Sequence, residues 1–395
     1  MIKIEDKSSC SGCSACYSIC PKDAISMKED TLGFKYPDVN LEKCIDCDLC
    51  VRVCAFNDSY QTPNNFDAPK LFAARQTDIS EVEKSRSGGI FAALSDIILD
   101  NGGVIYGAGY DSSFRVIHKR ADSKVKRDEF RGSKYVQSDM GDIFRQVEKD
   151  LKSGLQVLFS GTPCQTAGLA SYLRLHKIDM TNIFICDIVC HGVPAPAIWK
   201  DYIAFIEKKE KKKVIAVNFR DKQRFGWSAH KESFRLDDTY TYTYTYTFYK
   251  HIMFRHSCGV CHYTNFRRTG DITLADFWGW QNTDSEINAD DKGVSLIFVN
   301  TPKGEKLFSD ISDRIRKTPT VIEKCLQPNL QHPSKIHPKR MQFEADYPKL
   351  GFEKLMCKYA LMGWRFNLNN FILKIQHLIT RNRIAKRVIA RIVNR

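Results

Sequence analysis

The sequence has no long apolar segment. No stretch of about 18 apolar residues occurs in it, so no transmembrane helix is predicted. The opening residues, MIKIEDKSSC, lack the apolar stretch of a secretory signal peptide. A complete G-x-G-x-x-G motif is also missing, and Gly107-x-Gly109 is too short to predict NAD binding. The first two absences favour a cytoplasmic protein.

Positive charge is in excess, but the excess is concentrated at one end. The 395 residues include 60 Lys and Arg against 46 Asp and Glu, which gives a net charge of +14. Residues 365–395 contain eight Lys or Arg and no acidic residue. Their Ile and Leu residues recur at intervals of three and four, which is typical of an amphipathic helix. This basic tail is predicted to lie on an anionic membrane, to pack on the body of the protein, or to bind an acidic ferredoxin. Nucleic-acid binding is not expected, because no groove-reading motif accompanies the charge.

Cysteine, by contrast, is abundant, with 15 residues. Two runs near the start share the spacing C-x2-C-x2-C-x3-C, which is that of bacterial ferredoxins with two 4Fe–4S clusters. In that pattern the fourth cysteine of each run binds the cluster of the other run. The first predicted cluster is therefore held by Cys10, Cys13, Cys16 and Cys54, and the second by Cys44, Cys47, Cys50 and Cys20. The doubled spacing argues against a zinc site or disulfides, and the cysteine usage fits a reducing compartment.

The length predicts two or three domains and an α+β fold. We expect a two-cluster ferredoxin domain over residues 1–62 and a linker over 61–69. A mixed α/β body would follow, divided into residues 70–155 and 156–340, and residues 341–395 would form the basic helical tail.

Buried strands and helices alternate in the middle of the sequence. Strands are predicted at 156–160 and 183–189, each followed by a helix, at 165–176 and 197–213. This order implies parallel strands joined by right-handed crossovers. Two more helices are predicted at 90–99 and 139–152. Further strands are predicted at 71–75, 104–110, 114–120, 214–219, 231–236, 240–249, 271–277 and 294–299, and the alternating Tyr and Thr of 240–249 favour an edge strand.

Four more cysteines can meet at one edge of the predicted sheet. Cys164 and Cys190 each follow a buried strand, and successive parallel strands end at the same edge, where α/β sheets bind ligands. Cys258 and Cys261 form a C-x2-C pair further along. Four thiolates would suffice for a third 4Fe–4S cluster. Half a zinc site at the C-x2-C pair and a nucleophilic role for Cys164 are the alternatives. The remaining cysteines are expected to be structural: Cys186, Cys325 and Cys357.

Six segments of the chain together resemble one family. They are Ser87-Gly88-Gly89, residues 131–138 (RGSKYVQS), 161–165 (GTPCQ), 190–194 (CHGVP), the C-x2-C pair, and 271–279 (DITLADFWG). In this order they resemble the family of beta subunits of coenzyme F-420 hydrogenases and dehydrogenases, in the subgroup with a fused N-terminal ferredoxin domain. The resemblance spans residues 5–340 and leaves out the tail.

The resemblance implies an iron–sulfur oxidoreductase whose body binds FAD and a third 4Fe–4S cluster, the latter through Cys164, Cys190, Cys258 and Cys261. Ser87, Gly88 and Gly89 precede a helix, where backbone N–H groups suit the flavin diphosphate, with simple helix capping as the alternative. Lys134, with Ser133 and Gln137, would contact the flavin phosphate or its N1/O2 edge, unless Lys134 is a solvated surface lysine. Thr162 would bind the cofactor from the edge that carries Cys164.

Two of these residues are candidates for catalysis, Lys134 and His191. His191 would relay a proton near the flavin, or else only pack beside a cluster ligand. Asp276 is predicted to be a buried structural acid, paired with Arg267 or Arg268.

Two functions are compatible with this set of residues. One is a ferredoxin- or deazaflavin-linked reductase of an unidentified substrate, although no dedicated deazaflavin pocket is recognisable. The other is an electron-transfer subunit without a substrate of its own, which serves a partner enzyme. Either function predicts a redox partner, such as a ferredoxin or a dehydrogenase subunit, and the tail adds a possible contact with the inner face of a membrane.

Overall fold

The computed structural model describes residues 1–57, 60, 69–236 and 244–363, and the chain forms two compact units. The first unit is Met1–Pro338, and the second begins at Lys339. The boundary predicted at residue 340 therefore lies next to the boundary between units, whereas those predicted near 62 and 155 fall inside the first unit. Most of the predicted linker and the basic tail lie outside the described residues. No helix in the described ranges is long and apolar enough to cross a membrane.

The N-terminal module, residues 1–57, contains a hairpin and two short helices. Its strands β1 (Ile25–Glu29) and β2 (Lys35–Val39) pair antiparallel. The helices are α1 (Ala15–Ile19) and α2 (Leu49–Arg52), and a 3-10 turn at Lys7–Ser9 precedes the first cysteine.

The two cysteine runs of this module repeat the same backbone turn. Ser14 (φ 63°) directly precedes α1, and Asp48 (φ 56°) directly precedes α2. Two residues earlier, Gly12 (φ 72°) and Asp46 (φ 53°) also have positive φ. Left-handed residues at matching positions reverse the chain between the cysteines of each run, so that their side chains converge.

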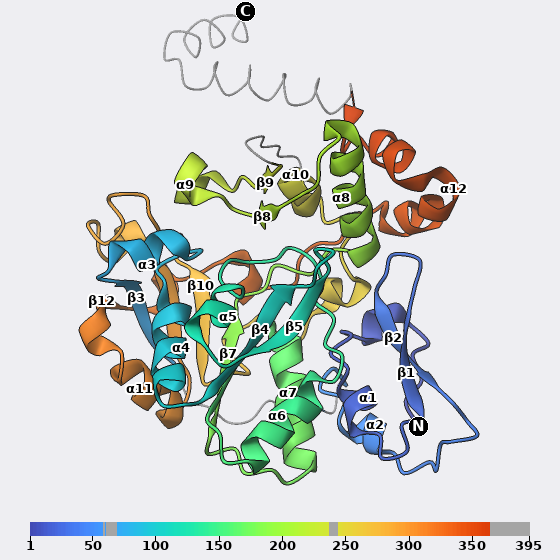
Figure 1. Ribbon diagram of the computed structural model, residues 1–395, viewed down its shortest axis with the longest axis horizontal. Coiled ribbons are helices and arrows are strands. Elements are labelled where there is room, and N and C mark those ends of the chain that lie inside the picture. Colours follow the sequence, from blue (N-terminus) through green and yellow to red (C-terminus); the bar gives the residue numbers. More distant parts are fainter. Residues whose placement is uncertain (58–59, 61–68, 237–243, 364–395) are drawn as a thin grey trace, which may run out of the picture. The chain divides into compact units, whose positions relative to one another are not determined.

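An eight-stranded mixed sheet forms the body, in the order β12-β3-β11-β10-β7-β6-β4-β5 (Figure 1). The four central strands, β10, β7, β6 and β4, are parallel, and the strands outside them pair antiparallel. The parallel pairing of β6 with β7 confirms the predicted β-α-β order. The strands are β3 (Lys70–Gln76), β4 (Val104–Tyr110), β5 (Val116–Ala121), β6 (Val157–Gly161), β7 (Ile183–Ile188), β10 (Ile272–Asp276), β11 (Ser295–Val299) and β12 (Ile315–Thr320).

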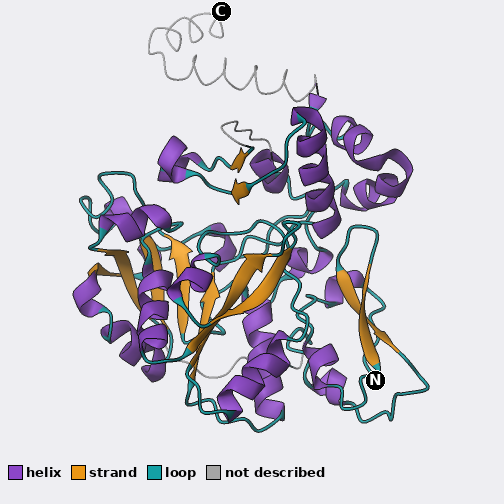
Figure 2. Cartoon of the chain, viewed as in Figure 1, coloured by secondary structure: helices purple, strands orange, loops and turns teal. Residues whose placement is uncertain are grey.

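Helices cover both faces of the sheet (Figure 2). On one face, α4 (Ile90–Asp100) and α11 (Pro302–Ser309) form a core with Leu158 of β6. On the other, α6 (Ile143–Lys152) and α7 (Pro163–Leu175) pack around Val157 and Phe159, the neighbours of Leu158 in the strand. Successive residues of a strand point to opposite faces, which is why one strand supplies both cores.

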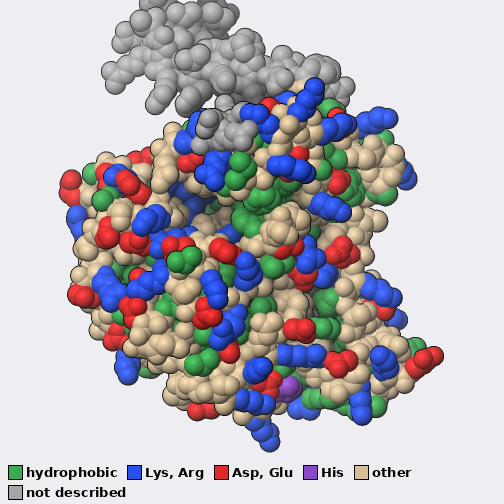
Figure 3. Space-filling view, viewed as in Figure 1, with side chains coloured by type: hydrophobic (Ala, Val, Ile, Leu, Met, Phe, Trp, Pro, Cys, Tyr) green, Lys and Arg blue, Asp and Glu red, His purple; other side chains and the backbone are tan. Residues whose placement is uncertain are grey.

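The remaining helices and strands of the described ranges are short, apart from α8 and α12. They are α3 (Ile79–Lys84), α5 (Lys124–Asp128), α8 (Pro196–Glu210), β8 (Ala216–Asn218), α9 (Lys222–Phe225), β9 (Ser233–Arg235), α10 (Tyr244–Tyr249) and α12 (Arg340–Lys358). On the face shown in Figure 3, Lys and Arg are interspersed with Asp and Glu, so the positive charge forms no continuous patch there.

The N-terminal module packs directly on α6 and α7. Cys13 and Ile19 share a core with Phe144 of α6 and Leu169 of α7. A Cβ atom at Gly168 would lie 2.9 Å from the Cys13 sulfur, so this close approach requires glycine. Arg145 adds hydrogen bonds from its guanidinium to the carbonyl oxygens of the module's first helix.

Two helix starts differ from the sequence-based expectation. The helix predicted from residue 139 begins at Ile143, because the chain at Asp139 still bonds to β5: its amide donates to Val116 O, and its carbonyl accepts from His118. The helix predicted from residue 165 begins at Pro163, because Thr162 and Gln165 form a reciprocal capping box.

The prediction of a strand at 240–249 is wrong where the chain is described. Residues 244–249 form helix α10, and residues 237–243 lie outside the described ranges. Tyr244, Thr247 and Phe248 are buried, at the spacing of one helical face rather than of a strand. Tyr244 contacts the rings of Trp199 and Tyr202, and this tertiary packing overrides the β propensity of the repeat.

A buried ion pair in the sheet provides a test of this packing. Asp187 of β7 and Arg268 are both almost fully buried, 2.8 Å apart. We expect Asp187→Ala to lower the free energy of unfolding by about 3–5 kcal/mol, because it removes the carboxylate that is paired with a buried guanidinium. Urea denaturation of anaerobically purified protein, followed by circular dichroism, measures this loss.

The matched control is Asp122→Ala, which removes an exposed pair with Lys126. It should cost less than about 1 kcal/mol. Equal losses of unfolding free energy in the two variants would contradict the expectation that the buried ion pair matters more for stability than the exposed one.

Candidate functional site

Twelve of the cysteines form three groups in space. Group I is Cys10, Cys13, Cys16 and Cys54, group II is Cys44, Cys47, Cys50 and Cys20, and group III is Cys164, Cys190, Cys258 and Cys261. None of the fifteen cysteines, all of which lie in the described ranges, forms a disulfide bond. Within the described ranges, no three His, Cys, Asp or Glu side chains converge closely enough for a single metal ion. A 4Fe–4S cluster needs a wider arrangement, because each thiolate binds a different iron atom.

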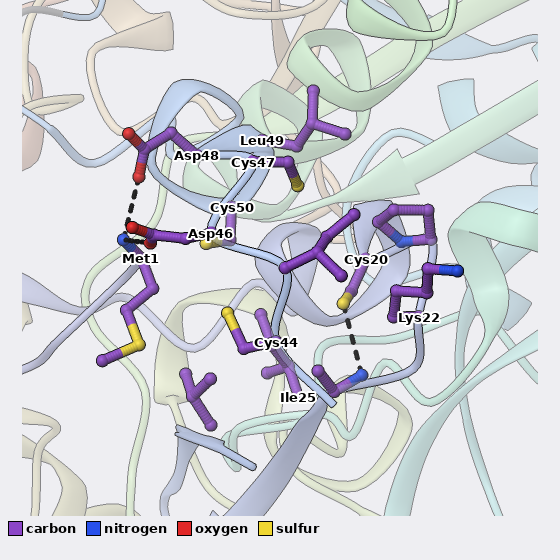
Figure 4. Close-up of a pocket in the computed structure, with 14 residues that line it drawn as sticks. Met1, Cys20, Lys22, Ile25, Cys44, Asp46, Cys47, Asp48, Leu49 and Cys50 are labelled. Carbon is purple, nitrogen blue, oxygen red and sulfur yellow. Dashed lines mark hydrogen bonds and ion pairs between the residues drawn. The ribbon is translucent and has the colours of Figure 1, made fainter. Parts of the chain in front are cut away.

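Group II lines one cavity of the N-terminal module. Figure 4 shows the sulfur atoms of Cys20, Cys44, Cys47 and Cys50 around the same space. The amides of Ile2 and Ala24 donate to the sulfur atoms of Cys50 and Cys20, at 3.2 and 3.3 Å. Cys47 is exposed, whereas the cysteines of group I are buried or half-buried.

Group I lies deeper, against α7. Burial raises the pKa of Cys16 well above its usual value, and the nearby Cys13, Cys10 and Cys54 raise it further. Burial likewise raises the pKa of Cys13 to about 12, with smaller contributions from Cys54, Cys10 and, from group III, Cys164. Cys54 of the second run thus lies beside the first run, as the ferredoxin pattern predicts, and groups I and III are close to each other.

Group III is assembled from three separate segments. Cys164 is at the start of α7, Cys190 follows β7, and the C-x2-C pair lies at a 3-10 turn, His256–Val260. All four line one cavity. The amides of Gly192 and Val193 donate to the sulfur atoms of Cys190 and Cys258, both at 3.4 Å, and Thr162 Oγ1 lies 3.3 Å from Cys164 Sγ, where either atom can donate. The amide donors favour the thiolate forms of Cys190 and Cys258.

The three other cysteines lie outside these groups. Cys186 is fully buried within β7, Cys325 is buried beneath the sheet edge, and Cys357 is exposed on α12. The nucleophilic alternative for Cys164 gains no support, because burial raises the pKa of its thiol.

A cavity of about 470 Å³ adjoins group III at the carboxyl ends of the parallel strands. Cys190 and His191 line both this cavity and the group III cavity. Six of the residues predicted to contact flavin or take part in catalysis line the large cavity: Ser87, Gly89, Ser133, Lys134, Thr162 and His191. They come from four segments that are far apart in the sequence.

Gly88 and Gln137, also predicted to bind the cofactor, are not among the lining residues. The Gly88 amide donates to Ser295 Oγ at 2.9 Å, and a Cβ there would collide with Ala74 O, so this glycine serves close packing. The Gln137 amide bonds to Ser11 O and to Arg255, both at 2.9 Å, which turns it toward the N-terminal module. Both residues thus have packing roles, and their predicted contacts with the cofactor stay predictions.

Lys134 is half-buried at the cavity wall and is not a freely solvated lysine. Its Nζ donates to the carbonyl oxygens of Glu129, Arg131 and Gly132. Burial lowers the pKa of this lysine to about 7, against an opposing effect of Glu129. An anionic group bound beside it would favour the charged form.

His191 is held in a histidine pair. Its Nε2 lies 2.9 Å from His251 Nε2, and His251 Nδ1 lies 3.0 Å from Lys335 O. Because a carbonyl only accepts, His251 Nδ1 carries a hydrogen and its Nε2 accepts from His191 when both rings are neutral. Burial lowers the pKa of His191 to about 4.

Part of the wall of the large cavity carries charged and aromatic side chains that the sequence did not predict as site residues. Asp276 pairs with Arg220, and Arg86 Nη2 lies 3.8 Å from the same carboxylate. The predicted pairing with Arg267 or Arg268 is wrong, because Arg268 is occupied by Asp187. Arg220 also lies over the ring of Trp278.

A buried histidine in the cavity wall, His118, was also missed. Its Nδ1 lies 2.9 Å from Ser138 Oγ, and its Nε2 lies 3.1 Å from Ser160 O. Burial lowers the pKa of His118 to about 4, so the ring is neutral at physiological pH. A lone histidine at the centre of a strand gives no signal of this role in the sequence.

Comparison with known proteins finds similarity for two regions of the first unit. Residues 154–322 match the family described as the C terminus of the coenzyme F420 hydrogenase/dehydrogenase beta subunit, and residues 9–57 match the 4Fe-4S dicluster domain. One F(420)H(2) dehydrogenase subunit, from Methanosarcina mazei, is 21% identical over 319 residues, which cover 78% of this chain and 83% of that protein. An uncharacterized ferredoxin of Methanocaldococcus jannaschii is 37% identical over 54 residues, which cover 14% of this chain and 69% of that protein.

One solved structure has a weaker similarity. A chain of the F420-reducing NiFe hydrogenase complex from Methanosarcina barkeri superposes with a TM-score of 0.46 at 17% identity, covering 75% of this chain and 91% of that one. A TM-score this low does not establish a common fold. The two matched regions carry the assignment: residues 154–322 are similar to the C-terminal part of coenzyme F420 hydrogenase/dehydrogenase beta subunits, and residues 9–57 are similar to 4Fe-4S dicluster ferredoxin domains.

Proposed function

We propose that this protein is an iron–sulfur flavoprotein that transfers electrons between FAD and three 4Fe–4S clusters, one in each cysteine group. The observation that carries the proposal is the sharing of Cys190 and His191 by the group III cavity and the large cavity. A cofactor in the large cavity would adjoin a cluster in group III, and group III lies next to group I through Cys164 and Cys13. The groups thus form a chain from the large cavity to the exposed Cys47.

The residues of the large cavity fit a flavin dinucleotide. Its volume lies within the range of about 300–1,000 Å³ common for cofactor sites. The first turn of α4, with Ser87 and Gly89 beside it, offers backbone N–H groups for a diphosphate. Arg86 and Arg220 each have a buried Nε that has no partner among the described residues, and both arginines line the cavity, so the wall offers these donors to an anionic ligand.

When bound, FAD supplies the conversion between a two-electron donor and the one-electron clusters. In the proposed arrangement, Lys134 holds negative charge at the cofactor and Thr162 orients it from the start of α7. His191, fixed by His251, is placed to hold or pass a proton at Nδ1. In this scheme, residues 70–155 and 156–340 both contribute to the flavin site, and residues 1–62 carry groups I and II.

The direction of electron flow and the final acceptor define two versions of this function. In one, the protein itself reduces a substrate, with reduced ferredoxin or a deazaflavin as the donor. In the other, it transfers electrons as one subunit of a larger enzyme, and the similarity to part of a dehydrogenase favours this version. Turnover of a small electron donor by the isolated chain supports the first version, and its absence in a flavin-loaded chain supports the second.

The proposed membrane contact through the tail concerns residues outside the described ranges.

Metal analysis tests the cluster count. We expect about twelve iron atoms and twelve sulfides per chain after anaerobic purification, since each cubane holds four of each. Cys258→Ser should lower the iron content to about eight, because it removes one ligand of group III. Cys186→Ser, a buried thiol in β7, is the matched control and should retain about twelve. About eight iron atoms in the unaltered chain would contradict a third cluster.

Flavin binding tests the role of Lys134. We expect Lys134→Met to weaken FAD binding by about 10- to 100-fold at pH 6, because it removes a positive charge that would attract the anionic cofactor. In the unaltered chain, affinity should fall as pH rises through about 7, because the ammonium loses its proton there. Lys134→Arg should bind FAD without this pH dependence, since arginine stays charged. Fluorescence titration with FAD measures all three proteins.

The control for this experiment is Lys124→Met, at an exposed lysine of α5. It should bind FAD as the unaltered chain does, with the same pH profile. The same profile in Lys134→Met would contradict a contact between Lys134 and the cofactor.

A further inference from the structure

One buried side chain lies between the N-terminal module and the body at the two adjacent cysteine groups. Arg255 is fully buried. Its Nε donates to Cys10 O at 2.8 Å, its Nη2 donates to Lys35 O at 2.9 Å, and Nη2 also lies 3.6 Å from Cys10 Sγ. These contacts connect the guanidinium to group I.

The same guanidinium also faces group III. Arg255 lines the cavity that the four group III cysteines share, three residues before Cys258. Burial raises the pKa of Cys164 and of Cys258, and the positive charge of Arg255 opposes that rise at both thiols. One charge therefore acts on sulfur ligands of two groups.

No carboxylate in the described part of the chain pairs with Arg255. Its Nη1 donates to the neutral Gln137 Oε1 at 2.9 Å, and its guanidinium lies 4.2 Å from the centre of the Tyr36 ring. Other buried arginines have an acid: Arg268 pairs with Asp187, and Arg127 pairs with Asp96. Buried charges are normally paired, so the missing counter-ion of Arg255 points to an anion that the protein itself does not supply.

We propose that Arg255 is a positioning residue whose charge raises the reduction potentials of the clusters in groups I and III together. This rests on the proposed function, since it requires clusters in both groups. A 4Fe–4S cluster with four thiolates is anionic and gains one more negative charge on reduction. A fixed positive charge nearby stabilises the reduced form more than the oxidised one, and net charge and hydrogen bonds to sulfur are among the factors that set cluster potentials. Group II keeps its own potential, because none of the described contacts of Arg255 is to a group II cysteine.

Redox titration of the full chain, monitored by EPR, tests the proposal. Arg255→Gln should lower the midpoint potentials of two clusters and leave the third unchanged. Arg255→Lys, which keeps the charge, should leave both midpoint potentials close to those of the unaltered chain. Signals are assigned to group III by their loss in Cys258→Ser. Arg127→Gln is the location control: the described partners of this buried arginine are Asp96, Asp128, Ala92 and Ser95 and include no cysteine, so the substitution should shift no potential.

A second variant covers the case in which Arg255→Gln fails to fold or loses iron. Gln137→Glu places a negative charge beside the guanidinium of Arg255, which is itself unchanged. This variant should lower the midpoint potentials of the same two clusters. The proposal is overturned if the clusters of groups I and III keep their midpoint potentials in a cluster-loaded Gln137→Glu or Arg255→Gln protein. It is also overturned if the midpoint potential of only one of these two clusters changes. Iron analysis separates this from failure of the proposed function, because a chain that never contained the third cluster holds about eight iron atoms.

Discussion

The packing of Cys13 against Gly168 determines how the N-terminal module meets the body. Only a residue without a side chain lets the module's first helix approach α7 so closely. Because α7 begins at Thr162 and Pro163, the same helix that receives Cys13 also presents Cys164. One close contact thus brings together a thiol of each of groups I and III, and the proposed electron path depends on that adjacency.

The central parallel strands give the site its position. β6, β7 and β10 end at one edge of the sheet, and the segments that leave them carry Thr162, His191 and Trp278. β3 runs in the same direction as β10, through the intervening antiparallel strand, and leads to Ser87 and α4. The large cavity is therefore a product of strand direction, in agreement with the rule that α/β sheets bind ligands beyond their carboxyl ends.

Charge is distributed unevenly within the buried part of this site. Arg268, deep in the sheet, is neutralised by Asp187 and contributes to stability. Arg86 and Arg220 share the single carboxylate of Asp276, and Arg255 has no acid in the part of the chain that the structure describes. Among these arginines, the ones without a full complement of acids in the described part of the chain line the large cavity or the group III cavity. This distribution suits anionic cofactors on general electrostatic grounds.

The sequence by itself determined the features that depend on local spacing. The doubled cysteine run identifies groups I and II, because a tight loop must bring three thiolates together and the fourth comes from the other run. Alternation of strands and helices placed Cys164 and Cys190 at one edge, since parallel strands end together.

Only the tertiary structure decided which distant side chains meet. Asp276 pairs with Arg220 instead of the nearby Arg268, and Gly88 and Gln137 are taken up by packing. The Tyr–Thr repeat becomes helical at residues 244–249, and Arg255 lies between two cysteine groups. Such pairings depend on the whole packed fold, because burial and competition among partners, not spacing along the chain, select them.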